Sequence, residues 1–440
     1  MTISKSASVI GFTGPFGSGC STASGILASR RGYRPFLLSS IIAERWKEEN
    51  TSRAPSRADL QELGNETRRK SGNPGALAEM AIGKLEQDAK EWNCVVIDGI
   101  RNVGEIEVLR ERFGRRFYLL AMECPASERW RRLQSGYVKN GLTIEDFLRD
   151  NERDRFQEYA HGQQVQLCVD RADVLLINDR NEKRDKFKFL SRKLLSYLDL
   201  ATGATPRYAK PAEILMNLAY SAAHGSKCLK RQVGAVLVAA PPNVMGEIVG
   251  QGFNENPIGT FACVEEPRYG ADAKRKIPGT CYRDIVRHQG FVKLAQLARR
   301  CPQCGQIIKD IAAVPPWRCR SCGVDLEEFF WPERAMTLCT AVHAEVAAIL
   351  AAGSRARGTT LYTTTFPCFQ CSEKIAQSGV KNIVFTEPYP DIRAAERLEI
   401  AGIEIERFEG IRSSRFDEIF SRARPYISEQ QQVIAASGKN

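Results

Sequence analysis

Two stretches of this 440-residue chain decide the fold of its second half: His343-Ala344-Glu345 and Pro367-Cys368-Phe369-Gln370-Cys371. Two thiolates separated by two residues at the start of a helix can bind one ion, and an imidazole from a second helix supplies a third ligand. A structural zinc site takes four protein ligands, whereas three leave a position open for water. We therefore expect His343, Cys368 and Cys371 to bind a catalytic zinc ion, rather than to be a structural site or free buried thiols.

Glu345 stands two residues after His343, so its carboxylate can reach a water on the zinc without ligating the metal. Zinc lowers the pKa of a bound water towards neutrality. A carboxylate beside that water can take its proton and deliver it to a substrate nitrogen. The order H-x-E…P-C-x-x-C resembles the signature of zinc deaminases of nucleobases, and the resemblance implies that Glu345 is the catalytic residue.

A phosphate-binding motif lies near the N-terminus, directly after a predicted buried strand over residues 8–13: Gly14-Pro15-Phe16-Gly17-Ser18-Gly19-Cys20-Ser21. It matches G-x-x-x-x-G-K-[ST] except that Cys20 stands where lysine is expected. Backbone N–H groups and the N-terminus of a following helix (22–29) can still bind phosphate, and Ser21 could ligate the Mg²⁺ of a bound nucleotide. The missing lysine argues against efficient phosphoryl transfer. The predicted nucleotide- and phosphate-binding residues are Gly14, Gly17, Ser18, Gly19, Cys20, Ser21, Thr22 and Asp98.

Further strands are predicted over residues 93–101, 116–123 and 174–178, and the first contains Asp98 where a Walker B aspartate would lie. Strands that alternate with helices predict a doubly wound parallel α/β domain, which we place at residues 1–200. This half resembles the nucleoside-monophosphate and dephospho-coenzyme A kinase branch of P-loop proteins. The resemblance implies an arginine lid from Arg129, Arg131 or Arg132. An inert scaffold, an active kinase and a nucleotide-sensing regulatory domain, which we favour, remain open.

Gly, Thr and Pro residues break the helical pattern at 199–207, so we predict a second domain over 208–428 and a flexible polar tail over 429–440. A helix is predicted from Pro211 to about Ser226, a strand at 233–238 and a turn at 250–257. Two zinc helices are predicted at 343–352 and 368–378, with strands at 360–364 and 381–386. These elements predict a mixed sheet with helices on both faces.

An insertion at about residues 295–330 carries two C-x-x-C-G knuckles, Cys301-Pro-Gln-Cys304-Gly305 and Cys319-Arg-Ser-Cys322-Gly323. This spacing predicts a zinc ribbon. The thiolates of Cys301, Cys304, Cys319 and Cys322 would close a structural zinc site. The ribbon is either a metal staple for a loop without a core or, given its arginine neighbours, a contact for nucleic acid or protein. The spacing of Cys263, Cys281, His288 and Cys339 follows no metal-binding pattern, so we interpret these cysteines as ordinary buried ones.

The second domain resembles the deoxycytidylate deaminase family over roughly residues 209–408, apart from the insertion. Besides the zinc motifs, the resemblance rests on Gln232-Val-Gly-Ala-Val236, Gly252-Phe-Asn254 and Glu387-Pro388-Tyr389. It implies a cytidine deaminase-like three-layer α/β/α fold in which Asn254 contacts the sugar and base and Tyr389 lines the nucleotide pocket. The backbone near Ala344 and Pro367 is expected to orient the base.

A P-loop kinase-like domain joined to a deoxycytidylate deaminase-type domain with a ribbon resembles the bacterial anti-phage dCTP deaminases. This resemblance implies hydrolytic deamination of dCTP and dCMP to deoxyuridine nucleotides and ammonia, which depletes the dCTP pool during phage infection. It also implies a homo-oligomer, an inhibitory RNA or protein partner, and a P-loop domain that responds to a nucleotide effector.

Composition limits the alternatives. A formal net charge of +11 favours polyanionic ligands, and nucleotides and nucleic acid both satisfy it. Fourteen cysteines without a secretory signal favour metal binding in a reducing, cytoplasmic setting, and no apolar run predicts a membrane span. A nucleic-acid editing deaminase and a bifunctional nucleotide kinase–deaminase stay as alternatives. The turn at Phe253-Asn254 and the lack of aromatic residues among the basic runs weigh against the first, and Cys20 weighs against the second.

Overall fold

The structure is a computed structural model that describes residues 7–49, 55–87, 92–139, 141–155, 160–179, 186–257, 341–388 and 392–422, together with 281, 300, 301, 303–307, 318, 319, 321–324, 326 and 339. Contacts divide the chain into two compact units, Met1–Ile214 with Arg407–Asn440, and Leu215–Glu406. The predicted domains, 1–200 and 208–428, stay a prediction; the units differ from them mainly because the chain returns to the first unit after Glu406. Among the described residues, no helix is long and apolar enough to cross a membrane.

The first unit is built on a sheet whose strand order, among the described residues, is β11-β5-β4-β1-β3-β2. Its first five strands in the chain run parallel, and the edge strand β11 pairs antiparallel with β5. The strands are β1 (Ser8–Thr13), β2 (Arg34–Leu37), β3 (Cys94–Ile100), β4 (Phe117–Glu123), β5 (Val174–Ile177) and β11 (Gly410–Ile411). The predicted parallel α/β fold of the first half is confirmed.

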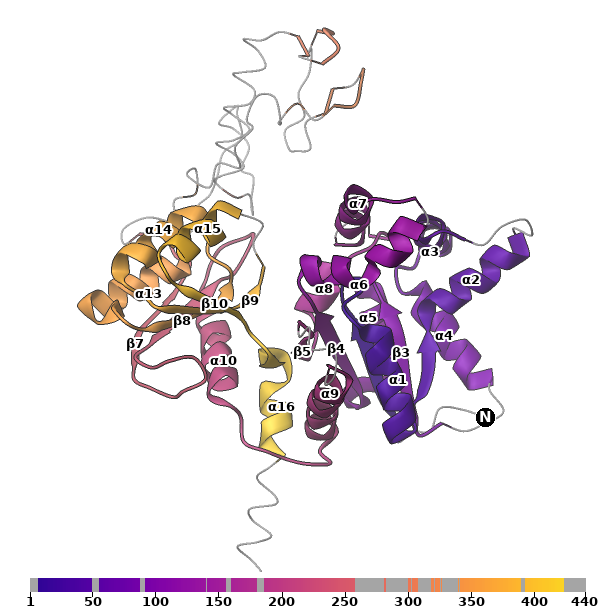
Figure 1. The fold of residues 1–440 in the computed structure, drawn as a ribbon, viewed down its shortest axis with the longest axis horizontal. Coiled ribbons are helices and arrows are strands. Elements are labelled where there is room, and N and C mark those ends of the chain that lie inside the picture. Colours follow the sequence, from indigo (N-terminus) through magenta and orange to yellow (C-terminus); the bar gives the residue numbers. More distant parts are fainter. Residues whose placement is uncertain are drawn as a thin grey trace, which may run out of the picture. The chain divides into compact units, whose positions relative to one another are not determined.

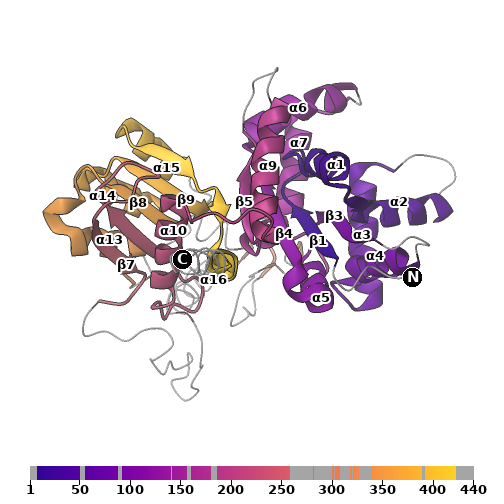
Figure 2. The ribbon, with the colours of Figure 1, turned by 90° about the horizontal axis from the view of Figure 1, so that it is seen from below.

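Helices cover both faces of this sheet. Figure 2 shows α1 and α9 on one side of it and α5 on the other. Ile10 and Phe12 of β1 are buried in a cluster with residues of α1 and α9. The side chain of Val9 points to the other face of the sheet, because successive strand residues alternate between the two faces. The helices are α1 (Cys20–Arg31), α2 (Leu38–Glu49), α3 (Arg57–Ser71), α4 (Ala76–Gln87), α5 (Val103–Phe113), α6 (Ala126–Lys139), α7 (Ile144–Arg155), α8 (Val165–Asp170), α9 (Lys186–Thr202) and α16 (Phe416–Ser421).

The second unit is built on a mixed sheet with the order β10-β9-β8-β6-β7 among the described residues. β6 pairs antiparallel with β7 and β8, whereas β8 and β9 are parallel. The strands are β6 (Gly234–Val238), β7 (Ile248–Phe253), β8 (Thr360–Thr365), β9 (Asn382–Glu387) and β10 (Glu404–Arg407). The helices are α10 (Pro211–Ala223), α13 (Ala344–Ala352), α14 (Phe369–Ser378) and α15 (Ile392–Ile400). The predicted mixed sheet is confirmed.

Glycines let the helices of the second unit approach both faces of its sheet. A Cβ on Gly234 would lie 1.9 Å from the carbonyl oxygen of Ala219 in α10. On the face that carries α13, a Cβ on Gly252 would lie 2.5 Å from the backbone nitrogen of Ala348. Figure 1 shows α10 on one side of this sheet and α13, α14 and α15 on the other, which confirms the predicted helix layers. The missing side chain at Gly252 thus sets the height of α13 above β7.

We predict that Gly252→Ala destabilises the protein by about 1–3 kcal/mol, since the added methyl group meets backbone that cannot move without shifting α13. Chemical denaturation followed by circular dichroism measures this change. Gly83→Ala in α4 is the control, because its Cβ would meet nothing within 4 Å. A Gly252→Ala variant as stable as the parent protein would contradict this account of the close packing.

Candidate metal centres and phosphate-binding pocket

The predicted zinc ligands of the second unit lie together at the ends of two helices. His343 is the N-cap of α13, Cys368 is the N-cap of α14, and Cys371 lies in the first turn of α14. His343 Nδ1 lies 3.2 Å from Cys371 Sγ and 3.4 Å from Cys368 Sγ. Tetrahedral zinc with ordinary bond lengths places such nitrogen and sulfur atoms about 3.5 Å apart. The three residues therefore fit a zinc ion.

Local backbone geometry turns these ligands towards one another. β8 ends at Thr365, and the buried Pro367 leads directly into the N-cap of α14. The backbone of His343 and of Cys368 is extended, with φ −74° at both residues. Each N-cap side chain therefore stands at the positive end of a helix dipole, which stabilises a thiolate. Hydrogen bonds from Cys371 and His343 lower the pKa of the Cys368 thiol, as a metal ligand requires.

Glu345 is buried in the first turn of α13, with 4% of its surface exposed. The Cys371 thiol donates a hydrogen bond of 3.6 Å to Glu345 Oε2, so the carboxylate lies beside the metal ligands. Burial raises the pKa of Glu345, while the charge of His343 opposes the shift. A carboxylate with a raised pKa is a better proton acceptor than one in water. The structure thus places the predicted acid beside a predicted metal ligand, and its role in proton transfer stays a prediction.

The four residues predicted to contact substrate lie in different settings. Asn254 uses its side chain internally: Oδ1 accepts from the Val233 N–H at 2.7 Å and Nδ2 donates to the Arg231 carbonyl at 2.8 Å. Ala344 and Pro367 are buried beside the zinc ligands. Tyr389 lies outside the described residues. Asn254 therefore fixes the segment from Arg231 to Val233, and any contact with a nucleotide would be additional to that role.

Arg231 is a residue that the sequence analysis did not single out. Its Nη2 lies 2.8 Å from Glu387 Oε2, which also accepts a hydrogen bond of 3.2 Å from the Thr365 hydroxyl. Thr365 and Glu387 end the neighbouring parallel strands β8 and β9, at the edge where Cys368 follows. The side chain of Arg231 is 40% exposed. The sequence offered one signal for this residue, its position directly before the Gln232-Val-Gly-Ala-Val236 motif. Other basic residues in the same turn made Arg231 hard to single out.

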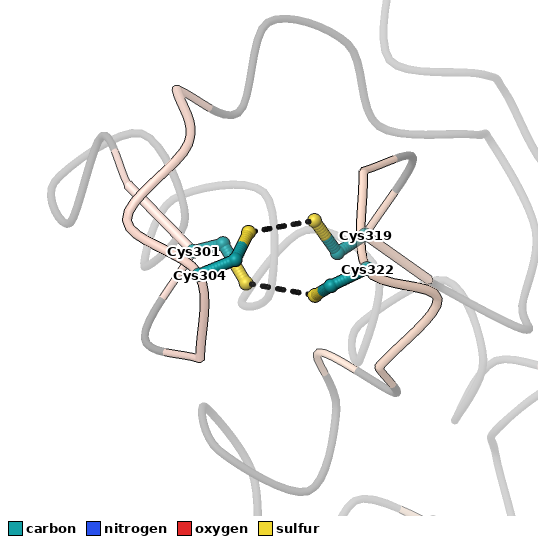
Figure 3. Close-up of side chains that lie close together, drawn as sticks. All are labelled: Cys301, Cys304, Cys319 and Cys322. Atoms are coloured by element: carbon teal, nitrogen blue, oxygen red, sulfur yellow. Dashed lines mark hydrogen bonds between the residues drawn. The ribbon is translucent and has the colours of Figure 1, made fainter.

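The four ribbon cysteines form a second group, shown in Figure 3. Cys301 Sγ lies 3.8 Å from Cys322 Sγ, and Cys304 Sγ lies 3.6 Å from Cys319 Sγ. Thiolates around one tetrahedral zinc ion lie about 3.8 Å apart. Backbone N–H groups of Cys322 and Ser321 lower the pKa of the Cys319 thiol. The group fits a zinc ion with four sulfur ligands, as its spacing predicted.

The remaining cysteines do not extend these groups within the described part of the chain. The metal-binding groups found there contain neither Cys281 nor Cys339. Cys281 is buried and Cys339 is partly exposed. Cys263 and His288 lie outside the described residues. The burial of Cys281 agrees with its interpretation as an ordinary buried cysteine.

The predicted P-loop residues line a cavity of about 750 Å³ in the first unit. Gly17 and Gly19 have φ values of 80° and 109°, which a residue with a side chain rarely adopts. The Ser21 hydroxyl donates to Asp98 Oδ2 at 2.8 Å, so the predicted Mg²⁺ ligand lies beside the aspartate at the Walker B position. The cavity is lined by Gly14, Gly17, Ser18, Gly19, Cys20, Ser21, Thr22 and Asp98, among others.

Cys20 cannot replace the missing lysine as a charge. Its thiol donates a hydrogen bond of 3.4 Å to the Thr13 carbonyl at the end of β1. Burial, assisted by the charge of Asp98, raises the pKa of Cys20 to about 12. The side chain is therefore a neutral tie between the loop and the strand at physiological pH. Any positive charge for a bound phosphate has to come from elsewhere in the cavity.

The three arginines of the predicted lid have different environments. Arg129 is buried and donates hydrogen bonds to the carbonyl groups of Phe16 and Cys124. It therefore links the P-loop to the segment that follows β4. Arg131 pairs with Glu128 on the surface of α6. Arg132 donates to the Gly17 and Asn178 carbonyl groups and lines the cavity. Of the three, Arg132 is the one placed to face a phosphate.

Parts of this chain are similar to known proteins. Residues 209–387 match the family model described as "Cytidine and deoxycytidylate deaminase zinc-binding region". The deoxycytidylate deaminase of Schizosaccharomyces pombe is 26% identical over 319 residues, covering 71% of this chain and 76% of the relative. The deoxycytidylate deaminase of Enterobacteria phage T4 is 29% identical over 203 residues, covering 44% of this chain and 88% of the relative.

A different relative matches over a shorter stretch. A UPF0200/UPF0201 protein of Archaeoglobus fulgidus is 34% identical over 152 residues, which are 34% of this chain. The chain spans 45% of the length of that relative. The chain is therefore similar to the deaminase zinc-binding region over residues 209–387 and, over another 152-residue match, to a UPF0200/UPF0201 protein.

We predict that the protein binds two zinc ions per chain and that the two sites load independently. His343→Ala and Cys304→Ser should each lower the zinc content by one ion, since each variant removes a ligand from a different site. Plasma emission spectroscopy of the purified full-length protein measures the stoichiometry. Cys168→Ala, at a buried cysteine outside both groups, is the control. An unchanged zinc content in His343→Ala would contradict the assignment.

Proposed function

We propose that the second unit hydrolyses the exocyclic amine of deoxycytidine nucleotides, dCTP or dCMP, giving deoxyuridine nucleotides and ammonia. The observation that carries the proposal is the buried Glu345 beside a metal group of three ligands. Four protein ligands would close the site, as in the ribbon, whereas three leave one position for the reaction. The match to the deaminase zinc-binding region supports the same chemistry.

In this reaction water adds to C4 of cytosine, the C4–N bond breaks, and ammonia leaves. Zinc, when bound by His343, Cys368 and Cys371, supplies an activated water at neutral pH. Glu345 would take one proton of that water and deliver it to the ring nitrogen. It would then take the second proton, from the hydroxyl group on C4, and deliver it to the leaving amine. The backbone near Ala344 and Pro367 orients the base, since both residues adjoin metal ligands.

Recognition of the nucleotide phosphate is assigned to Arg231. Its guanidinium is partly exposed and held by Glu387 at the strand edge where the metal ligands lie. Asn254 fixes the backbone of this arginine through Nδ2 and thereby positions it. We propose that Asn254 and Tyr389 also border the sugar and base. A free nucleotide is favoured over a base in a nucleic acid strand because no aromatic residues are interleaved with the basic runs of the sequence.

The first unit is proposed to regulate deamination by binding a nucleotide, and Ser21 and Asp98 are the residues that would hold its Mg²⁺. The P-loop glycines and the Ser21–Asp98 contact support binding, while the neutral Cys20 disfavours phosphoryl transfer. The biological role that we propose is depletion of the dCTP pool in anti-phage defence. The protein would act in the cytoplasm as a homo-oligomer, held inactive by an RNA or protein partner.

We predict that Glu345→Gln lowers kcat at least a hundredfold while zinc stays bound, because the amide cannot accept the water proton. The assay follows uracil formation from dCTP, dCMP, CMP and a cytosine-containing single strand, each with and without ATP, GTP and dTTP. Glu373→Gln on α14 is the control, since this residue is half exposed and outside the metal groups. Full activity of Glu345→Gln would overturn the mechanism, and turnover of the single strand alone would favour an editing deaminase.

A second prediction concerns substrate choice. Arg231→Gln should raise KM for dCMP about tenfold or more and leave the kinetics with deoxycytidine unchanged, because the nucleoside has no phosphate to lose. The control is Arg355→Gln, which removes the same charge from an exposed pair with Glu247. An equal effect on nucleotide and nucleoside would show that Arg231 acts only through the fold.

A further inference from the structure

A buried carboxylate on α7 gathers two arginines at the cavity of the first unit. Asp154 is 1% exposed, and its Oδ1 accepts hydrogen bonds from Arg57 Nη2 at 3.1 Å and from Gln61 Nε2 at 3.2 Å. The same oxygen accepts from Arg101 Nη1. Arg57 and Gln61 belong to α3, and Arg101 directly follows β3. One oxygen atom therefore ties α7 to two other segments of the unit.

This contact leaves hydrogen-bonding capacity unused. Within the part of the chain that the structure describes, Asp154 Oδ2, Gln61 Oε1 and Arg57 Nε are buried without a hydrogen-bond partner. Buried polar atoms without partners cost free energy, so an arrangement that satisfied them would be favoured. Gln61, which is 6% exposed, lines the cavity, as do both arginines. Two of the three unused atoms therefore belong to residues that line the space where a ligand would lie, Gln61 and Arg57.

The charges at this point form one connected group, in which Arg101 faces the carboxyl groups of both Asp154 and Asp98. Two guanidinium groups share one carboxylate, and burial together with the nearby charge of Arg101 lowers the pKa of Arg57. Arg101 acts on the P-loop side as well, since its charge opposes the rise that burial causes in the pKa of both Cys20 and Asp98. The positive charge that the loop lacks at Cys20 is therefore present beside it, held by Asp154.

We propose that Asp154 is an internal counter-ion that competes with a ligand phosphate for Arg57 and Arg101, so that phosphate binding in the cavity releases α7 from α3. The ligand class is a small phosphate- or diphosphate-bearing molecule, because paired guanidinium groups recognise such oxygens. The proposal rests on the first unit alone, so a protein without deaminase activity would leave it standing.

Release of α7 would be transmitted to the loop and to α6. The ring of Phe147 on α7 lies 5.2 Å from that of Phe16 in the loop and 5.5 Å from that of Trp130 on α6. Tyr137 of α6 donates a hydrogen bond to Asp150 on the same helix α7. A change in the hold on α7 therefore reaches both walls of the phosphate site through direct contacts.

The test uses full-length protein titrated with inorganic pyrophosphate in a calorimeter. Asp154→Asn should bind pyrophosphate about tenfold more tightly than the parent protein, because the internal competitor is removed while the side-chain shape is kept. Glu152→Gln is the matched control, since it removes the same charge from an exposed position on the same helix. Equal or weaker binding by Asp154→Asn, or no binding by either protein, would overturn the proposal.

A second measurement needs no variant, in case Asp154→Asn folds poorly. Pyrophosphate should raise amide hydrogen exchange several-fold in peptides from α7 (Ile144–Arg155), with no rise in α5 (Val103–Phe113), which takes no part in the contact. Unchanged or slower exchange in α7 at saturating pyrophosphate would show that Asp154 is a permanent staple between α7 and α3, and the proposal would be wrong.

Discussion

The meeting of two helix N-termini at the edge of β8 is the constraint around which the second unit is arranged. His343 and Cys368 are both N-cap residues, and their ligand atoms lie 3.4 Å apart. Such an approach puts the positive ends of two helix dipoles together, which is unfavourable unless negative charge lies between them. The Cys368 thiolate and the Glu345 carboxylate supply that charge. The metal ligands therefore stabilise the packing that brings them together.

The two cysteine-containing groups show how one donor chemistry serves two purposes. In the ribbon, four sulfur ligands lie together, and Cys304 and Cys322 are exposed. In the second unit, the group has three candidate metal ligands instead of four, and the buried Glu345 lies beside them. Closure of the coordination shell stabilises a loop, whereas an open position beside an acid permits chemistry.

In the first unit, the charge for phosphate recognition lies on other segments than the loop itself. A P-loop lysine brings its charge on the helix that follows the loop, but Cys20 gives a neutral tie to β1 instead. Arg57, Arg101 and Arg132 line the same cavity from α3, the segment after β3, and α6. Because two of these arginines are held by Asp154, the phosphate recognition that we propose would depend on α7, which a loop lysine would not require.

The sequence by itself determined the parts of this protein whose geometry depends on short spacing. The strand over Ser8–Thr13, the loop that follows it and both zinc groups were predictable, because a few residues of strand, turn or helix bring the relevant atoms together. Only the tertiary structure decided the pairing of β11 with β5, the Arg231–Glu387 pair and the Asp154 contact with Arg57. Their partners lie 97 to more than 200 residues apart in the chain, so the packing of whole elements brings them together, and no local pattern specifies it.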